Sequence, residues 1–239
     1  MPRRARLCPP GLPLHVVHRG HNRGPCFSTW RDRERYLEAL SELSGDTHCS
    51  IHAFVLMTNH VHLLVTPKDG EGISRMMKGA AQRHAQFMNW KQGKSGSLWQ
   101  GRFHSSPVDT EAYFLACHRY IELNPVRAGL ARHPRDYPWS SYLRNAEGQP
   151  TSLVEPHAQY LALGADDETR QLAYRSLFEL PLEQRIVDEI RAGALGGFAL
   201  GTPAFHARLE AQLGVRTRKG SRGRPRASPQ ATVVDCYKP

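Results

Sequence analysis

Apolar residues recur along the first half of the chain with two different periods, and each period predicts one kind of element. Between residues 50 and 57 they alternate, which predicts a strand with Ile51, Ala53 and Val55 on one face. Between residues 72 and 90 they repeat every three or four positions, which predicts an amphipathic helix. The same two periods predict strands from Leu14, at 60–66 and at 103–108, and helices at 30–43 and 110–124.

The order of these elements predicts the fold. Strand, helix, strand, strand, helix, strand is the order of a ferredoxin-like split βαβ arrangement, an α+β fold with an antiparallel four-stranded sheet. We expect helices on one face of this sheet and an open second face that serves as a platform. The seventh element is a further helix that stops at Asn124, because Pro125 disfavours helical geometry in the residue before it.

Beyond residue 145 the sequence predicts a linker, a small helical module and a tail. Residues 1–145 hold the predicted sheet and the helix that follows it. Residues 146–156 are rich in Gly, Pro, Ser and Thr and read as a linker. Residues 157–214 predict a small module of short amphipathic helices at 166–178, 182–192 and 203–213, with an acidic stretch that we expect to face solvent. Residues 215–239 are basic and predict a disordered DNA-binding tail.

Charge narrows the range of partners. Lys and Arg number 32 against 22 Asp and Glu, so the formal net charge is +10, which favours nucleic acid or an anionic surface as partner. No run of 18 apolar residues occurs, and no secretion signal is recognised, so we expect a cytoplasmic, nucleoid-associated protein without a membrane partner. Five cysteines without a C-x-x-C pair argue against a zinc ribbon and a disulfide framework.

Two histidines on the third predicted strand form a candidate metal site. His60 and His62 are two positions apart, so their imidazoles lie on the same face of the strand. Two neutral imidazoles on one face make a bidentate grip for a divalent cation. The alternative is a pair of histidines tolerated on a half-exposed strand.

Tyr120 and Asn124 stand four residues apart on the helix that follows the sheet, one turn from each other. If that side of the helix faces the two histidines, Asn124 offers an amide oxygen as a third ligand and Tyr120 places its phenol beside the cation. The alternative is that Tyr120 is an ordinary core tyrosine of an amphipathic helix.

Four stretches together resemble a known family. NHVHLLV, SLWQGRFHS, YIELNPVRAGL and DYPWSSY resemble the single-tyrosine HUH transposases, and most closely the REP-associated tyrosine transposases. The resemblance spans about residues 12–145, although the family more often reads RGN where this chain has RGHN at 19–22. It implies that His60 and His62 are the histidines of the HUH motif, that Tyr120 is the nucleophile and that Asn124 is the third ligand. The implied metal is Mg²⁺ or Mn²⁺, although two imidazoles alone do not exclude Zn²⁺.

The implied reaction is transesterification of single-stranded DNA next to palindromic hairpins, through a 5′-phosphotyrosine link that a 3′-hydroxyl later resolves. No ATP is needed, and the chain has no phosphate-binding P-loop sequence. Trp99 is a candidate for stacking on an unpaired base, with packing in a loop as the alternative. The tail sequence RGRPR resembles a minor-groove arm, with a solubilising tail as the alternative. The candidate DNA contacts are Arg19, Asn22, Arg23, Arg102 and Arg127, and Arg222, Arg224 and Arg226 in the tail.

Two other functions fit the same sequence. A regulator would bind single-stranded or hairpin nucleic acid through the basic arms without cutting it. A metal-dependent nuclease would cut with an activated water and leave Tyr120 structural. The sequence favours neither a monomer nor a homodimer.

Overall fold

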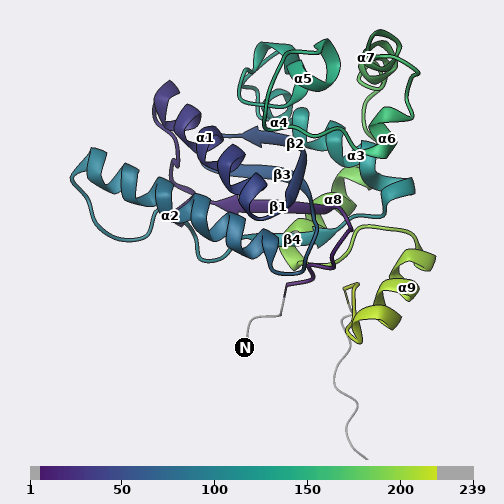
Figure 1. Ribbon diagram of the computed structural model, residues 1–239, viewed down its shortest axis with the longest axis horizontal. Helices are drawn as coiled ribbons and strands as arrows, with labels where there is room; N and C mark the ends of the chain where they lie inside the picture. Colours follow the sequence, from purple (N-terminus) through teal and green to yellow (C-terminus); the bar gives the residue numbers. More distant parts are fainter. Residues whose placement is uncertain (1–5, 220–239) are drawn as a thin grey trace, which may run out of the picture.

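A four-stranded antiparallel sheet forms the centre of the molecule. The computed structural model describes residues 6–219. The strands are β1 (Leu14–Arg19), β2 (Cys49–Leu56), β3 (His60–Pro67) and β4 (His104–Pro107). They lie in the order β2-β3-β1-β4, so the two strands joined by the short 57–59 connection are neighbours and β1 lies inside the sheet (Figure 1). The predicted ferredoxin-like α+β fold is confirmed.

Two long helices cover one face of the sheet. They are α1 (Trp30–Asp46) and α2 (Gly72–Gln92), which lie side by side (Figure 1). Helix α1 begins at a capping box in which the carboxylate of Asp32 accepts hydrogen bonds from the backbone N–H groups of Ser28 and Thr29. Apolar residues of both helices pack on the side chains that the strands direct to this face, such as Val16 and Leu63. Burial of these side chains is the main source of stability for this half of the molecule.

Strand β2 departs from simple alternation. The register with β3 shifts between Ile51 and Ala53, because a bulge at this point adds one residue to β2. Ile51 therefore packs in the same cluster as Phe54, while Ala53 packs on the opposite face. The prediction that Ile51 and Ala53 share one face was wrong for this reason.

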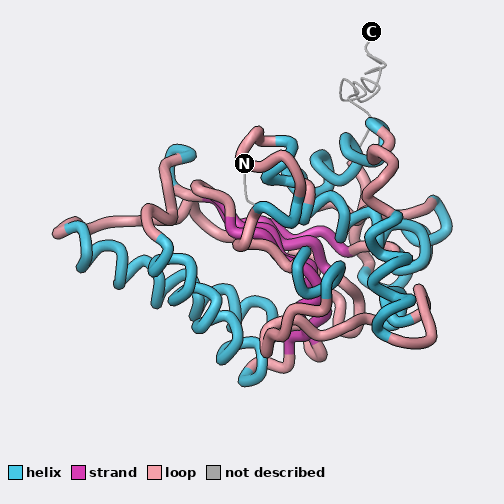
Figure 2. Tube along the Cα trace, turned by 90° about the horizontal axis from the view of Figure 1, so that it is seen from above, coloured by secondary structure: helices cyan, strands magenta, loops and turns pink. Residues whose placement is uncertain are grey.

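The second face of the sheet is covered as well, which corrects the expectation of an open platform. Helix α3 (Thr110–Glu122) lies against β2 and β3, and helix α8 (Gln184–Gly196) lies against β4 and β1. Figure 2 shows the strands with helices on both sides. Val187 and Ile190 of α8 are buried in one cluster with Phe114 of α3. A segment expected to face solvent therefore supplies part of the core.

The expected linker is also packed. Leu153 and Val154 are buried, and the backbone N–H of Glu155 donates a hydrogen bond to the carbonyl of Ile51. The remaining elements are η1 (His21–Arg23), α4 (Asn124–Arg127), η2 (Pro134–Asp136), α5 (Tyr142–Glu147), α6 (Ala158–Leu161), α7 (Asp167–Ser176) and α9 (Pro203–Leu213). Sequence periodicity predicted α7, α8 and α9 but missed the short α5 and α6.

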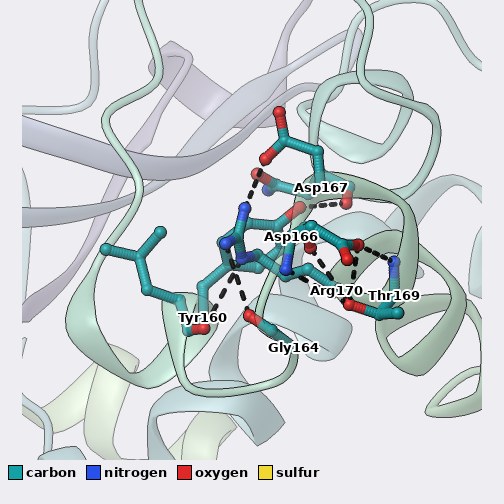
Figure 3. Close-up of polar contacts among 8 residues, drawn as sticks. Tyr160, Gly164, Asp166, Asp167, Thr169 and Arg170 are labelled. Atoms are coloured by element: carbon teal, nitrogen blue, oxygen red, sulfur yellow. Dashed lines mark hydrogen bonds and ion pairs between the residues drawn. The ribbon is translucent and has the colours of Figure 1, made fainter.

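Polar contacts of Arg170 hold the turn between α6 and α7 (Figure 3). Its guanidinium donates to the carbonyl of Gly164 and forms an ion pair with Asp167. Asp166 caps α7 by accepting a hydrogen bond from the backbone N–H of Thr169. These contacts fix the start of the helix that carries Tyr174 into a small aromatic cluster with α5.

A buried carboxyl joins α3 to this aromatic cluster. Glu122 is fully buried and accepts hydrogen bonds from the side chains of Ser141, Asn145 and Tyr174. Burial raises the pKa of Glu122 to about 7, although the three hydrogen bonds lower it in part.

Stability is therefore expected to carry a Glu122 contribution that decreases as the pH rises. The unfolded chain releases this proton near pH 4.5, and the folded chain holds it up to about pH 7, so the contribution is lost between these two values. The variant Glu122→Gln lacks this contribution, so the slope of its stability against pH should differ from that of the wild type by about one proton between pH 4.5 and 7, which urea denaturation of both proteins from pH 4.5 to 8 measures. The hydroxyl of Tyr174 also lies 3.1 Å from Nδ1 of His118, so it has a second partner when it accepts from the new amide. An unchanged pH dependence in the variant would contradict a titrating Glu122.

Within residues 6–219, no helix is long and apolar enough to cross a membrane. The tail residues Arg222, Arg224 and Arg226 lie outside the described residues.

Candidate active site

A cavity of about 860 Å³ lies on the sheet face that α3 and α8 cover. Strand β3 contributes His60 and His62, and the end of α3 and the start of α4 contribute Tyr120 and Asn124. Helix α8 closes one side with residues 194–197. The fold therefore brings the four residues of the predicted centre to one cavity.

Both histidines are in the neutral imidazole form. Their ring centroids lie 4.9 Å apart. Burial lowers the pKa of His60 to about 4 and that of His62 well below its ordinary value, and neighbouring positive groups add to both shifts. Nδ1 of His60 lies 2.6 Å from the Asn59 side-chain oxygen, and Nδ1 of His62 lies 2.8 Å from Nε2 of His15. Each Nδ1 thus has a partner, which leaves both Nε2 atoms for another ligand.

Tyr120 lies beside these rings. The side chain is only 5% exposed, but it lines the cavity, and its ring centroid is 6.0 Å from that of His62. The guanidinium of Arg127 lies over the Tyr120 ring at 4.0 Å and also donates to the Tyr120 carbonyl. Asn124 donates to the same carbonyl through Nδ2, so its side-chain oxygen is left for another contact. Two side chains therefore hold the helix end on which Tyr120 sits.

Comparisons with known proteins find one matching family model and similar solved structures. Residues 10–124 match the sequence model described as IS200-like transposase. This part of the chain is similar to that family. The family resemblance predicted from the four sequence stretches is thereby confirmed. No curated protein matches the chain.

A solved structure shows a similar fold. One is described as the structure of the REP-associated tyrosine transposase bound to a REP hairpin. The sequences are 21% identical, the TM-score is 0.52, and the match covers 66% of this chain and 93% of the other. A crystal structure of a transposase-like protein from Deinococcus radiodurans R1 is 20% identical, with a TM-score of 0.36, and covers 50% of this chain and 95% of the other. The second match is too weak to support an argument.

Arginines surround the cavity. Arg19, Arg23 and Arg102, expected as DNA contacts, line it, and no carboxylate is among the described residues that do. Asn22 lies in the exposed turn after β1 but is not part of the lining. Both Asn22 and Arg23 have positive φ angles, of 50° and 58°, so the turn at the rim is strained. The expected contact Arg127 lies on Tyr120 instead of at the rim.

Trp99 does not lie open to an unpaired base. It is 5% exposed, its ring stacks on His18 with centroids 4.3 Å apart, and its Nε1 donates to the carbonyl of Ala81. The prediction of a base-stacking Trp99 is corrected to that of a core residue, which was the alternative reading.

Three residues of the site were missed from the sequence. Arg6 and Arg191 line the cavity from outside the predicted centre, and His15 contacts both His62 and Tyr120. The sequence contained only a weak signal for His15: it lies two positions before Val17 and therefore shares a face of the first strand with it. Arg191 had none, because nothing local in the sequence shows that α8 reaches the cavity.

Proposed function

We propose that this chain is a metal-dependent endonuclease and strand transferase that cuts and rejoins single-stranded DNA next to hairpins. Tyr120 is the nucleophile, and the intermediate is a 5′-phosphotyrosine link. One observation carries the proposal: a phenol and two neutral imidazoles, 58 to 60 positions apart in the sequence, meet in one arginine-lined cavity. The similarity of residues 10–124 to a transposase family supports DNA as the substrate.

Two imidazole nitrogens and an amide oxygen would make a donor set for a divalent cation. We place Mg²⁺ or Mn²⁺ on Nε2 of His60, Nε2 of His62 and the side-chain oxygen of Asn124. These three atoms are available, because the hydrogen bonds of the two histidines use Nδ1 and the hydrogen bond of Asn124 uses Nδ2. Within residues 6–219 no group of three His, Cys, Asp or Glu side chains forms an alternative metal site. When bound, the cation polarises the target phosphate and stabilises negative charge on its oxygens.

Side chains of the protein carry out the other parts of the proposed reaction. The phenol oxygen of Tyr120 attacks phosphorus as it loses its proton, and the bond from phosphorus to the 3′-oxygen breaks. The 3′-oxygen takes up a proton and leaves as a hydroxyl, and the 5′-phosphate stays on Tyr120. Arg127 keeps the phenol ring in place, and the cavity arginines hold the phosphates on either side of the cut. A 3′-hydroxyl that attacks the phosphotyrosine reverses these steps and seals a strand.

Hairpin DNA is the proposed partner. The structurally similar REP-associated tyrosine transposase is described as bound to a REP hairpin. The net charge of +10 and the arginine rim favour a polyanion. Arg222, Arg224 and Arg226 of the tail remain candidates for holding the hairpin stem. The proposed mechanism is the same for a monomer and for a homodimer.

The second candidate function is a regulator that binds such DNA without cutting it. Coverage of the catalytic face by α8 favours it, because this helix narrows access to Tyr120. The presence of all three catalytic groups in one cavity favours the enzyme.

A covalent-adduct assay separates the two candidates. The protein is incubated with a hairpin oligonucleotide that carries a single-stranded 5′ flank, and denaturing gels then report any DNA–protein adduct. We expect an adduct with Mg²⁺ or Mn²⁺ and none with EDTA, because the phosphate then loses its polarising cation. A blunt hairpin without a flank is the control DNA and should bind without forming an adduct. Binding of the flanked hairpin with no cleavage under any of these conditions would support the regulator.

A further inference from the structure

A third histidine lies behind the two candidate metal ligands. His15 is in the middle of β1, 1% exposed, on the strand that pairs with β3. Its Nε2 lies 2.8 Å from Nδ1 of His62, and the two rings are stacked with centroids 5.1 Å apart. Its ring also meets the edge of the Tyr120 ring at 5.8 Å. His15 is therefore in contact with a ligand and with the nucleophile at once.

The direction of the hydrogen bond follows from metal binding. A cation on Nε2 of His62 uses the lone pair of that nitrogen, so the ring proton must sit on Nδ1. Nδ1–H of His62 then donates to Nε2 of His15, and the proton of His15 must sit on its own Nδ1. That Nδ1 is buried and has no hydrogen-bond partner among residues 6–219.

An unpartnered N–H in the core is costly, and an apolar side chain of similar size would avoid the cost. Packing therefore does not explain a histidine at this position. An acceptor aimed at Nδ1 of His62 does explain it, because ligating histidines are oriented through the nitrogen that does not bind metal.

We propose that His15 is a positioning residue that fixes the tautomer and ring orientation of His62 and so prepares Nε2 of His62 for the cation. Asn59 does the same for His60, at 2.6 Å from its Nδ1. The inference rests on the proposed metal site and adds a residue to it. Through its contact with the Tyr120 ring, His15 also keeps the nucleophile in register with the metal.

Mn²⁺ affinity, measured by electron paramagnetic resonance without DNA, tests this role independently of activity. The variant His15→Met keeps the bulk but offers only the weak acceptor of a thioether sulfur, and we expect roughly 10- to 100-fold weaker Mn²⁺ binding. The variant His15→Gln places an amide oxygen where Nε2 was, and should restore most of the affinity. His84→Met is the matched control. His84 is a buried, hydrogen-bonded histidine in the core cluster on the opposite face of the sheet, and its loss should leave Mn²⁺ binding unchanged.

The wild-type protein gives a second measurement that does not depend on how the variants fold. Nitrogen-15 spectra of the histidine rings in the Mg²⁺-loaded protein should show His62 protonated on Nδ1 and His15 protonated on Nδ1. Protonation of His15 on Nε2 would overturn the inference, and so would equal Mn²⁺ affinity of the wild type and a folded His15→Met. A wild type that binds no Mn²⁺ would overturn the metal site itself. The two failures are therefore distinguishable.

Discussion

Replacing Tyr120 with phenylalanine should abolish the covalent DNA–protein adduct and lower strand cleavage by at least roughly a thousandfold. The change removes only the phenol oxygen, which is the atom that would attack phosphorus. The ring should keep its contacts with His15 and Arg127, because these contacts involve the ring and not the oxygen. Hairpin affinity and melting temperature should therefore stay close to those of the wild type. Denaturing gels, gel shifts and thermal melts measure the three quantities.

Tyr113 supplies the matched control. It lies on the same helix, and its hydroxyl donates to Glu189 of α8 at 2.6 Å. The variant Tyr113→Phe should cost about 1 kcal/mol of stability through the lost hydrogen bond and still form the adduct. If Tyr120→Phe instead cleaved DNA normally without an adduct, an activated water would be the nucleophile, and Tyr120 would be a core residue only.

Local sequence rules predicted the elements of the fold, because the periods of helices and strands depend on residues that are close together in the chain. Strand alternation placed His60 and His62 on one face of β3, and helical periodicity placed Tyr120 on α3. The predicted stop at Asn124 was wrong, because α3 ends at Glu122 and Asn124 begins α4 with Pro125 in its first turn. The meeting of these side chains in space was an expectation from resemblance, and the cavity now shows it. The bulge after Ile51 was not predictable, because it depends on pairing with β3 and not on the residues of β2 alone.

The cover over the second face of the sheet was missed for a different reason. Helix α8 is amphipathic with acidic and basic residues on its outer side, and the sequence does not say against which surface its apolar side packs. In the structure that side packs on α3 and the sheet, which brings Arg191 to the cavity. Trp99 and His15 show the same limit, since burial of a residue is decided by partners far away in the chain.

Buried histidines should make the protein sensitive to acid. Burial lowers the pKa of His18 and of His52 to about 4, and that of His118 well below its ordinary value. In the unfolded chain each takes up a proton near pH 6.5, while in the fold it stays neutral, so stability falls as the pH falls from about 6.5 to about 4. For His18 and His52 the loss is roughly 3 kcal/mol each at pH 4. Two such losses are comparable to the whole stability of an ordinary domain.

Urea denaturation from pH 7 to pH 4 measures this loss. His52 is not among the residues that line the cavity, and its ring nitrogens hydrogen-bond with the carbonyl of Glu155 and the hydroxyl of Thr66. The variant His52→Gln keeps a polar side chain that does not titrate, so its stability should fall less steeply by about one proton, or about 1.4 kcal/mol per pH unit. Glu122→Gln should act in the opposite direction, because the raised pKa of Glu122 offsets part of the histidine effect between pH 4.5 and 6.5. A wild type as stable at pH 4.5 as at pH 7 would show that these imidazoles become protonated without unfolding.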